Sequence, residues 1–227
     1  MKTIISVIML IMMTTLSYAN DIYVTQSGAS LDLDITQDGE NNTIGNSTTA
    51  STSTGATTIL NIDQIGDSNV ITYQINGATY TGVINLVGNS NNVDLNCDST
   101  GGNSSCGSAN AVINFTGNSN DIDLDIGQTS SATSADVDIV GQSGSDSNVV
   151  AATVDGNSAI LTITVNGDTN NYLIDIDGNG DSVGHTYVHT HTGSIADVDI
   201  TQSGIYDNMI TLTTSGDNHD IDIIQRD

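Results

Sequence analysis

The sequence predicts an all-β fold, a two-sheet β-solenoid in which short strands stack in successive coils. Three observations lead to this prediction. Turn glycines recur at intervals of 11 or 12 residues along most of the chain. Between them, apolar and polar side chains alternate at period two, the pattern of a half-buried strand. No sustained helical pattern of apolar residues follows Ala19. Such repeated units bury a continuous core only when they stack on one another.

The N-terminus has the features of a secretory signal peptide. Met1 and Lys2 precede a short apolar run, and small residues lead to Ala19. We expect cleavage after Ala19, so that residues 1–19 are the signal peptide and residues 20–227 form a single exported repeat domain. The apolar run is too short to predict a membrane span, and the mature chain is expected to have none.

The repeat unit is clearest around Gly66. Gln64, Gly66 and Asn69 form the pattern Q-x-G-x-x-N, and apolar residues follow Asn69 at period two as far as Ile75. Each unit is interpreted as one strand of about six residues followed by a tight turn. Two units of about 11 residues make one coil, which gives about sixteen half-units and about eight coils.

Four intervals between the turn glycines are longer than 25 residues. Each is interpreted as a turn that has grown into an inserted surface loop. The first three are rich in Ser, Thr, Gly and Asn, and the fourth carries three histidines. The predicted loops lie near residues 46–57, 98–108, 128–134 and 185–195.

Gln and Asn at fixed offsets from the glycines are predicted to form hydrogen-bonded ladders. Equivalent residues of neighbouring layers lie about 4.8 Å apart, so each amide can bond to its copies above and below. The simpler interpretation, that Asn merely follows Gly in turns, does not explain a second Asn three residues after Gly. His219 replaces this Asn in the last unit. The predicted ladder residues are Gln26, Gln37, Gln64, Gln142, Gln202, Gln225, Asn42, Asn69, Asn91, Asn120, Asn148, Asn170 and Asn208.

The chain has two cysteines, Cys97 and Cys106, on either side of a Gly/Ser/Asn-rich segment. In an exported protein, such a pair predicts a local disulfide. The spacing matches neither a zinc knuckle nor a C-x-x-C redox site.

The charge is strongly one-sided, with 27 acidic and two basic residues and a formal net charge of −25. Binding to nucleic acid or to an anionic membrane surface requires cationic side chains and is therefore excluded. Outward-facing Asp residues of neighbouring layers are expected to repel one another unless salt or a divalent cation screens them.

Two groups of side chains are candidate metal ligands, although the fold requires no cofactor. Asp175, Asp177, Asn179 and Asp181 begin like a calcium loop but lack its final Glu, and a solvated acidic turn is the alternative. His185, His189 and His191 alternate along the chain and are candidate transition-metal ligands, with a polar loop as the alternative.

The sequence does not predict an enzyme. Ser, His and Asp are present, but no nucleophile elbow, phosphate loop or metal-binding helix appears. A monomeric acidic solenoid that serves as a binding module remains an alternative, as a calcium-dependent adhesin or a carbohydrate- or ice-binding protein. Outward Thr pairs do not recur in successive coils, so no regular ice-binding face emerges.

The unit x-Q-x-G-x-x-N-x-Φ-x-Φ (Φ, apolar), with its hexad complete at 37–42 and 64–69, resembles the curlin repeat. Curlins are the subunits of curli, the secreted bacterial amyloid fibres of the biofilm matrix. The resemblance implies export through outer-membrane secretion machinery, a nucleator subunit, and fibre growth by end-to-end stacking. It also implies roles in adhesion and cell aggregation. The chain departs from curlins in its acidity, its inserted loops and its cysteine pair.

Both ends of the predicted stack lack proline, lysine and an evident cap. Monomeric solenoids cover or blunt such strand edges. Open coils at both ends favour head-to-tail stacking into a homopolymer.

Overall fold

The computed structural model describes residues 19–39, 41–45, 50–66, 68–97, 106–127, 134–177, 184–204 and 208–226. All regular structure in these ranges is β, in 17 strands. The strands are β1 (Ala19–Ile22), β2 (Thr25–Ser27), β3 (Ser30–Asp38), β4 (Asn41–Ile44), β5 (Ser51–Ile65), β6 (Val70–Val87), β7 (Asn92–Cys97), β8 (Ser108–Thr116), β9 (Asp121–Ile126), β10 (Ser134–Gly141), β11 (Val149–Asp155), β12 (Ala159–Asn166), β13 (Asn170–Asp177), β14 (Thr186–Thr192), β15 (Ala196–Ser203), β16 (Met209–Ser215) and β17 (Asp220–Arg226).

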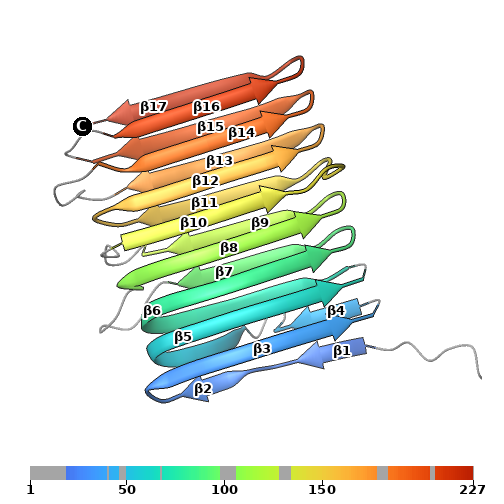
Figure 1. Ribbon diagram of the computed structural model, residues 1–227, viewed down its shortest axis with the longest axis vertical. Helices are drawn as coiled ribbons and strands as arrows, with labels where there is room; N and C mark the ends of the chain where they lie inside the picture. The colour runs from blue at the N-terminus through green and yellow to red at the C-terminus, as the bar shows by residue number, and fades with distance from the viewer. Residues whose placement is uncertain are drawn as a thin grey trace, which may run out of the picture.

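The strands stack into a β-solenoid with two faces, as predicted (Figure 1). Face A consists of β1, β2, β4, β7, β9, β11, β13, β15 and β17, and face B of β3, β8, β10, β12, β14 and β16. The long strands β5 and β6 turn the corner and contribute their first part to face A and their second part to face B. The number of coils is close to the eight expected.

Every strand pairs in parallel with its equivalent in the next coil, and the register is kept from coil to coil. Ile62, for example, pairs with Ile84, which pairs with Ile113. Equivalent residues therefore form columns that run the length of the stack. The inward columns are mostly Ile, Val, Leu and Ala, and they form a continuous core between the two faces. This arrangement is the physical consequence of the two-residue alternation along each strand.

Two of the predicted loops are wrong in part. Residues 185–195 include strand β14, and residues 51–57 belong to β5, which crosses the corner at Gly55 without a break. The sequence predicts loops here because both segments lie in long intervals between turn glycines and are rich in polar residues. In the structure their polar side chains fill inward slots: Ser51, Ser53 and His189 are buried. Most of the other two loops, at 98–105 and 128–133, lies outside the described residues, while Ser108 and Ser134 begin strands.

In the described part of the chain, no helix is long and apolar enough to cross a membrane. The predicted signal peptide lies outside the described residues except for Ala19.

Candidate functional site

Four asparagines at one corner of face A form a continuous ladder. Asn91, Asn120, Asn148 and Asn170 lie in one column, and each side-chain amide donates to Oδ1 of the next, with Nδ2–Oδ1 distances of 2.8, 3.0 and 2.9 Å. The same Oδ1 atoms also accept the backbone N–H of the preceding Asn, at 3.1, 2.9 and 2.9 Å. All four side chains are at most 2% exposed. Oδ1 of Asn120, of Asn148 and of Asn170 thus each accepts two N–H hydrogen bonds from the coil before it. This common direction of donation gives the stack a polarity.

The ladder asparagines also close their own turns, which explains the Gly-x-x-Asn spacing. Asn91 Nδ2 donates to the carbonyl of Gly88 at 3.0 Å, and Asn120 Nδ2 donates to that of Gly117 at 2.7 Å. Asn69 closes its turn on Gly66 in the same way, but it forms no bond to Asn91 and lies outside the ladder. Between Gly and Asn the chain passes through a left-handed residue, as at Ser119 with φ 59°. The glycine, the left-handed residue and the Asn therefore act as one unit of turn chemistry.

The glutamine ladder is shorter than predicted. Gln64 Nε2 donates to Gln37 Oε1 at 2.7 Å, and Gln225 Nε2 donates to Gln202 Oε1 at 3.4 Å, in two separate columns. Gln26 lies in the column of Gln225 but stacks on Ser53 rather than on another Gln.

The prediction for Gln142 is wrong, because this side chain is exposed. The inward slot belongs to Gly141, and the ring of Phe115 occupies the space that a side chain there would need. A Cβ on Gly141 would lie 2.6 Å from Phe115 Cζ. The prediction assumes that the Gln of every Gln-x-Gly segment points into the core. The turn after Gln142 has one more residue than most of the others, and here the inward position falls on Gly141 instead.

Asn208 belongs to a different ladder from the other asparagines, at a corner of face B. Its Oδ1 accepts the backbone N–H of His185 at 3.0 Å, and His185 Nδ1 accepts the N–H of Ala159 at 3.2 Å. His219 does the same on face A, where its Nδ1 accepts the N–H of Ala196 at 3.3 Å. Imidazole Nδ1 thus replaces the amide oxygen at both corners, as predicted for His219.

The inner face of β14 carries a buried layer of tyrosine and histidine. Tyr187 OH lies 2.9 Å from His189 Nδ1, and Tyr172 OH of β13 lies 3.0 Å from His191 Nδ1. Burial, and then the neighbouring His191, lowers the pKa of His189 to about 3. Burial also lowers the pKa of His191 and raises that of Tyr187. These imidazoles are therefore neutral at pH 7.

The geometry does not support the predicted transition-metal site at His185, His189 and His191. Among the described residues, no group of three or more His, Cys, Asp or Glu side chains is arranged to hold a metal ion. The imidazoles of β14 instead hydrogen-bond to tyrosine hydroxyls within the core. In the candidate calcium loop, Asp175 and Asp177 lie in β13, while Asn179 and Asp181 lie outside the described residues.

A second ladder, in the turns, was not predicted. Asn89 Oδ1 accepts the N–H of Asn118, and Asn118 Oδ1 accepts the N–H of Asp146, at 2.9 and 3.0 Å. Asp146 and Asp168 continue this series with distances of 2.6 Å, the last bond coming from Ser194 N–H. The recurrence of Asn or Asp directly before the left-handed residue is the sequence signal that would have identified it.

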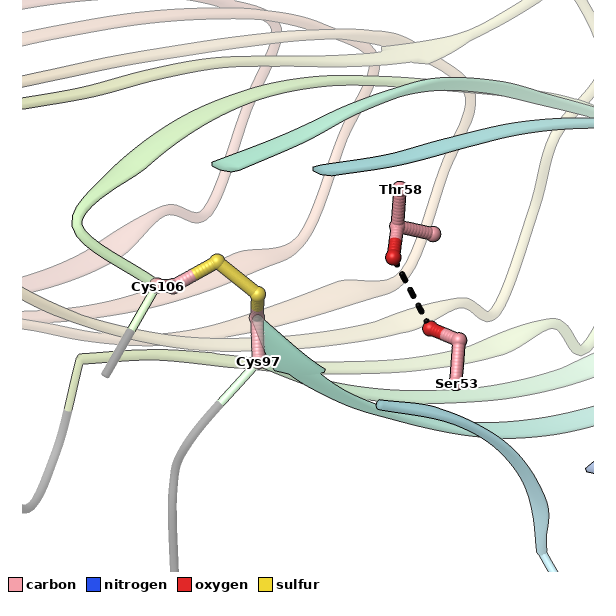
Figure 2. Close-up of a disulfide and its surroundings, with 4 residues drawn as sticks. All are labelled: Ser53, Thr58, Cys97 and Cys106. Carbon is pink, nitrogen blue, oxygen red and sulfur yellow. Dashed lines mark hydrogen bonds between the residues drawn. A yellow bond between two sulfur atoms is a disulfide. The ribbon is translucent and has the colours of Figure 1, made fainter. Parts of the chain in front are cut away.

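The predicted disulfide joins Cys97 to Cys106, with a Cα–Cα distance of 5.5 Å. Both cysteines are fully buried. Figure 2 shows them beside Ser53 and Thr58, whose hydroxyl oxygens lie 3.0 Å apart. Ser53 lies two coils below Cys97 in the same column. The hydroxyl pair and the disulfide therefore fasten the same corner, where the chain passes from face A to face B.

The acidic outer faces are interleaved with amides. Asn61 Nδ2 donates to Asp34 Oδ1 at 2.7 Å, and Asn85 Nδ2 donates to Asp63 Oδ1 at 2.6 Å, each between neighbouring coils. Four pairs of acids nevertheless stack directly on each other: Asp94 and Asp123, Asp155 and Asp177, Asp197 and Asp220, and Asp199 and Asp222. Burial, followed by the charges of nearby acids, raises the pKa of Asp123. The repulsion expected between coils is thus diluted along much of the stack.

The C-terminal end rung exposes apolar core positions, whereas Ile22, Val24 and Leu33 of the N-terminal rungs are partly buried. Among the described strands, β16 pairs only with β14, and β17 only with β15; at the other end, β1, β2 and β3 also pair on one side only. Ile221 and Ile223 of β17 are 37% and 45% exposed, whereas Ile200, in the same column as Ile223, is 2% exposed. These edges are where another strand can add.

No protein-family model, curated protein or solved structure matches the chain.

Proposed function

We propose that this protein is a secreted structural subunit of a curli-like extracellular amyloid fibre. The observation that carries the proposal is the pair of open end rungs on a stack of parallel, in-register strands. A strand edge with unpaired backbone groups and exposed apolar side chains is a template for another strand. Opposite edges on one chain make a head-to-tail contact that does not close, and such contacts produce filaments.

The ladders add a second line of support. Asn120 and Asn148 each accept hydrogen bonds from the coil before and donate to the coil after. At the C-terminal end, Gln225 donates to Gln202 in the same manner, and a further chain that continues this column would extend the pattern, which contributes to cross-β stability. The complete Q-x-G-x-x-N unit, at 37–42 and 64–69, is the element that resembles the curlin repeat, and its Gly-x-x-Asn half recurs at Asn91, Asn120 and Asn170 of the Asn ladder.

In this proposal the partner is a second copy of the same chain. Export follows from the predicted signal peptide. Contributions to the biofilm matrix, adhesion and cell aggregation, together with a nucleator and outer-membrane secretion machinery, follow from the curlin resemblance. The proposed role is structural rather than catalytic.

The experiment is assembly of the mature chain, residues 20–227, followed by electron microscopy and sedimentation with and without calcium. We expect unbranched fibres. Ile223→Lys, which places a charge on the inward side of the exposed edge, should block growth. Ile224→Lys adds the same charge one residue later, on the outward side, and should allow it. A single monomer boundary at high protein and calcium concentration would contradict the proposal and favour a monomeric binding module.

A further inference from the structure

The two end rungs of the stack have matching columns. The register of every internal pair carries each column from the first coil to the last, so the columns define which residues of the two ends are equivalent. On face A, the column of Ile22 ends at Ile221, and the column of Gln26 ends at Gln225. In both columns the N-terminal residue and its C-terminal equivalent are separated by the same number of residues in the sequence.

Face B gives an independent alignment. The column of Leu33 ends at Ile210, and that of Gln37 ends at Thr214. On each face, therefore, every residue of the N-terminal end rung has one equivalent residue in the C-terminal end rung.

We infer that β16 and β17 of one copy seat on β3 and on β1 and β2 of the next in this single register, with Ile221 on Ile22, Gln225 on Gln26, Ile210 on Leu33 and Thr211 on Asp34. The inference rests on the proposed function, because it names the contact by which the subunits stack.

The inward side chains fit this contact. Ile221 and Ile223 meet Ile22 and Val24, so that apolar residues cover apolar residues. The N-terminal pair is already partly packed on the core. Gln225, which donates to Gln202 within its own chain, extends its column to Gln26. Each exposed core position of one rung is covered by a partly buried one of the other.

The outward side chains of face B fix the polarity of the contact. Strand β3 carries three outward acids, whereas its equivalents on β16 are uncharged: Asp32, Asp34 and Asp38 correspond to Met209, Thr211 and Ser215. Two N-terminal rungs placed against each other would bring together two strands that each carry three outward acids. Head-to-tail stacking avoids this, because the C-terminal rung offers face B no carboxylate.

Face A keeps one pair of like charges in this register. Asp220 meets Asp21, while Asp222 meets Tyr23 and Arg226 meets Ser27. Because an acid pair at the junction is screened by salt, assembly should be faster at higher ionic strength.

The test compares two substitutions on one strand. Thr211→Asp and Thr213→Asp add the same charge to outward positions of β16, and within the chain these residues stack on Val188 and Thr190. Only Thr211 meets an acid across the proposed junction, since Thr213 meets Thr36. We expect Thr211→Asp to slow fibre elongation about two- to five-fold relative to Thr213→Asp, and Thr211→Lys to accelerate it over Thr213→Lys by a similar factor.

The exchange variant Thr211→Asp with Asp34→Thr moves the carboxylate across the junction and should restore the elongation rate. Equal rates for the Asp variants at 211 and 213, with no restoration by the exchange, would overturn the proposed register. Fibres of the unmodified chain in the same experiment would still support the proposed function; their absence would instead count against that function.

Disulfide trapping gives a second measurement. Chains with Thr211→Cys mixed with chains with Asp34→Cys should form covalent dimers within fibres, because adjacent strands bring Cα atoms to about 4.8 Å. Thr211→Cys mixed with Thr36→Cys is the matched control, two residues out of register. Equal trapping in both mixtures, or stronger trapping in the control, would refute the register.

Discussion

Asn120→Ala tests the ladder where it is continuous on both sides. The side chain accepts the N–H and the Nδ2 of Asn91, and donates to the carbonyl of Gly117 and to Asn148 Oδ1. After truncation, the N–H of Asn91 and the carbonyl of Gly117 lose these partners in a buried corner. A buried polar group left without a partner costs about 1–3 kcal/mol, so we expect the free energy of unfolding to fall by roughly 2–5 kcal/mol.

The assay is urea denaturation of dilute, unassembled protein, monitored by circular dichroism. Asn110→Ala is the control, because Asn110 is an exposed residue on the outward side of β8 and should cost less than about 0.5 kcal/mol. The slope of the transition must also be compared, since a solenoid can unfold in parts. If the two variants lose the same stability, the ladder does not hold the corner and the reasoning is wrong.

Three further predictions concern the core. The folded pKa of His189, about 3, is below its ordinary value of 6.5, so the stability that its neutral form contributes above pH 6.5 is lost as the pH falls toward 3, at about 1.4 kcal/mol per pH unit; the hydrogen-exchange protection factors of β14, corrected for the intrinsic exchange rate at each pH, should fall between pH 7 and 5, and should fall less in His189→Ile. Gly141→Val should destabilise by about 1–3 kcal/mol through its clash with Phe115, measured by thermal melting, and Gly141→Val with Phe115→Ala should recover part of the loss. Replacing both Cys97 and Cys106 with Ala should lower stability by about 2–4 kcal/mol, and a reductant should then leave the melting temperature of the variant unchanged.

The fold could be predicted because its determinants are local and repeated. The alternation of apolar and polar residues after Gly66 specifies a strand, and the recurrence of the unit specifies stacking. The Asn ladder followed from the same repeat, since Asn91, Asn120 and Asn170 each stand three residues after a turn glycine. These features require only that equivalent residues lie above one another.

The errors arose where polar residues occupy core positions. The sequence predicts a loop around the histidines of β14, yet they form a layer in which the hydroxyls of Tyr187 and Tyr172 hydrogen-bond to Nδ1 of His189 and of His191. Such partners come from neighbouring positions and strands and cannot be seen in one unit. The parity shift at Gly141 also depends on a long-range contact, because it is the Phe115 ring that requires a residue without a side chain.

The pairing of outward acids with amides of the next coil could not be predicted from a single repeat unit. Asp34 is paired with Asn61, which is 27 residues away, and only the register between coils brings them together. The sequence showed the acids on one face, but not that their neighbours in the next coil are often amides.

X-ray diffraction from aligned assemblies of the mature chain tests the central claim most directly. If the columns continue from one subunit to the next, the strands lie perpendicular to the fibre axis, and a sharp reflection at about 4.7–4.8 Å should appear along that axis. Assemblies that lack this axial reflection, or that show it at right angles to the fibre axis, would contradict stacking through the end rungs.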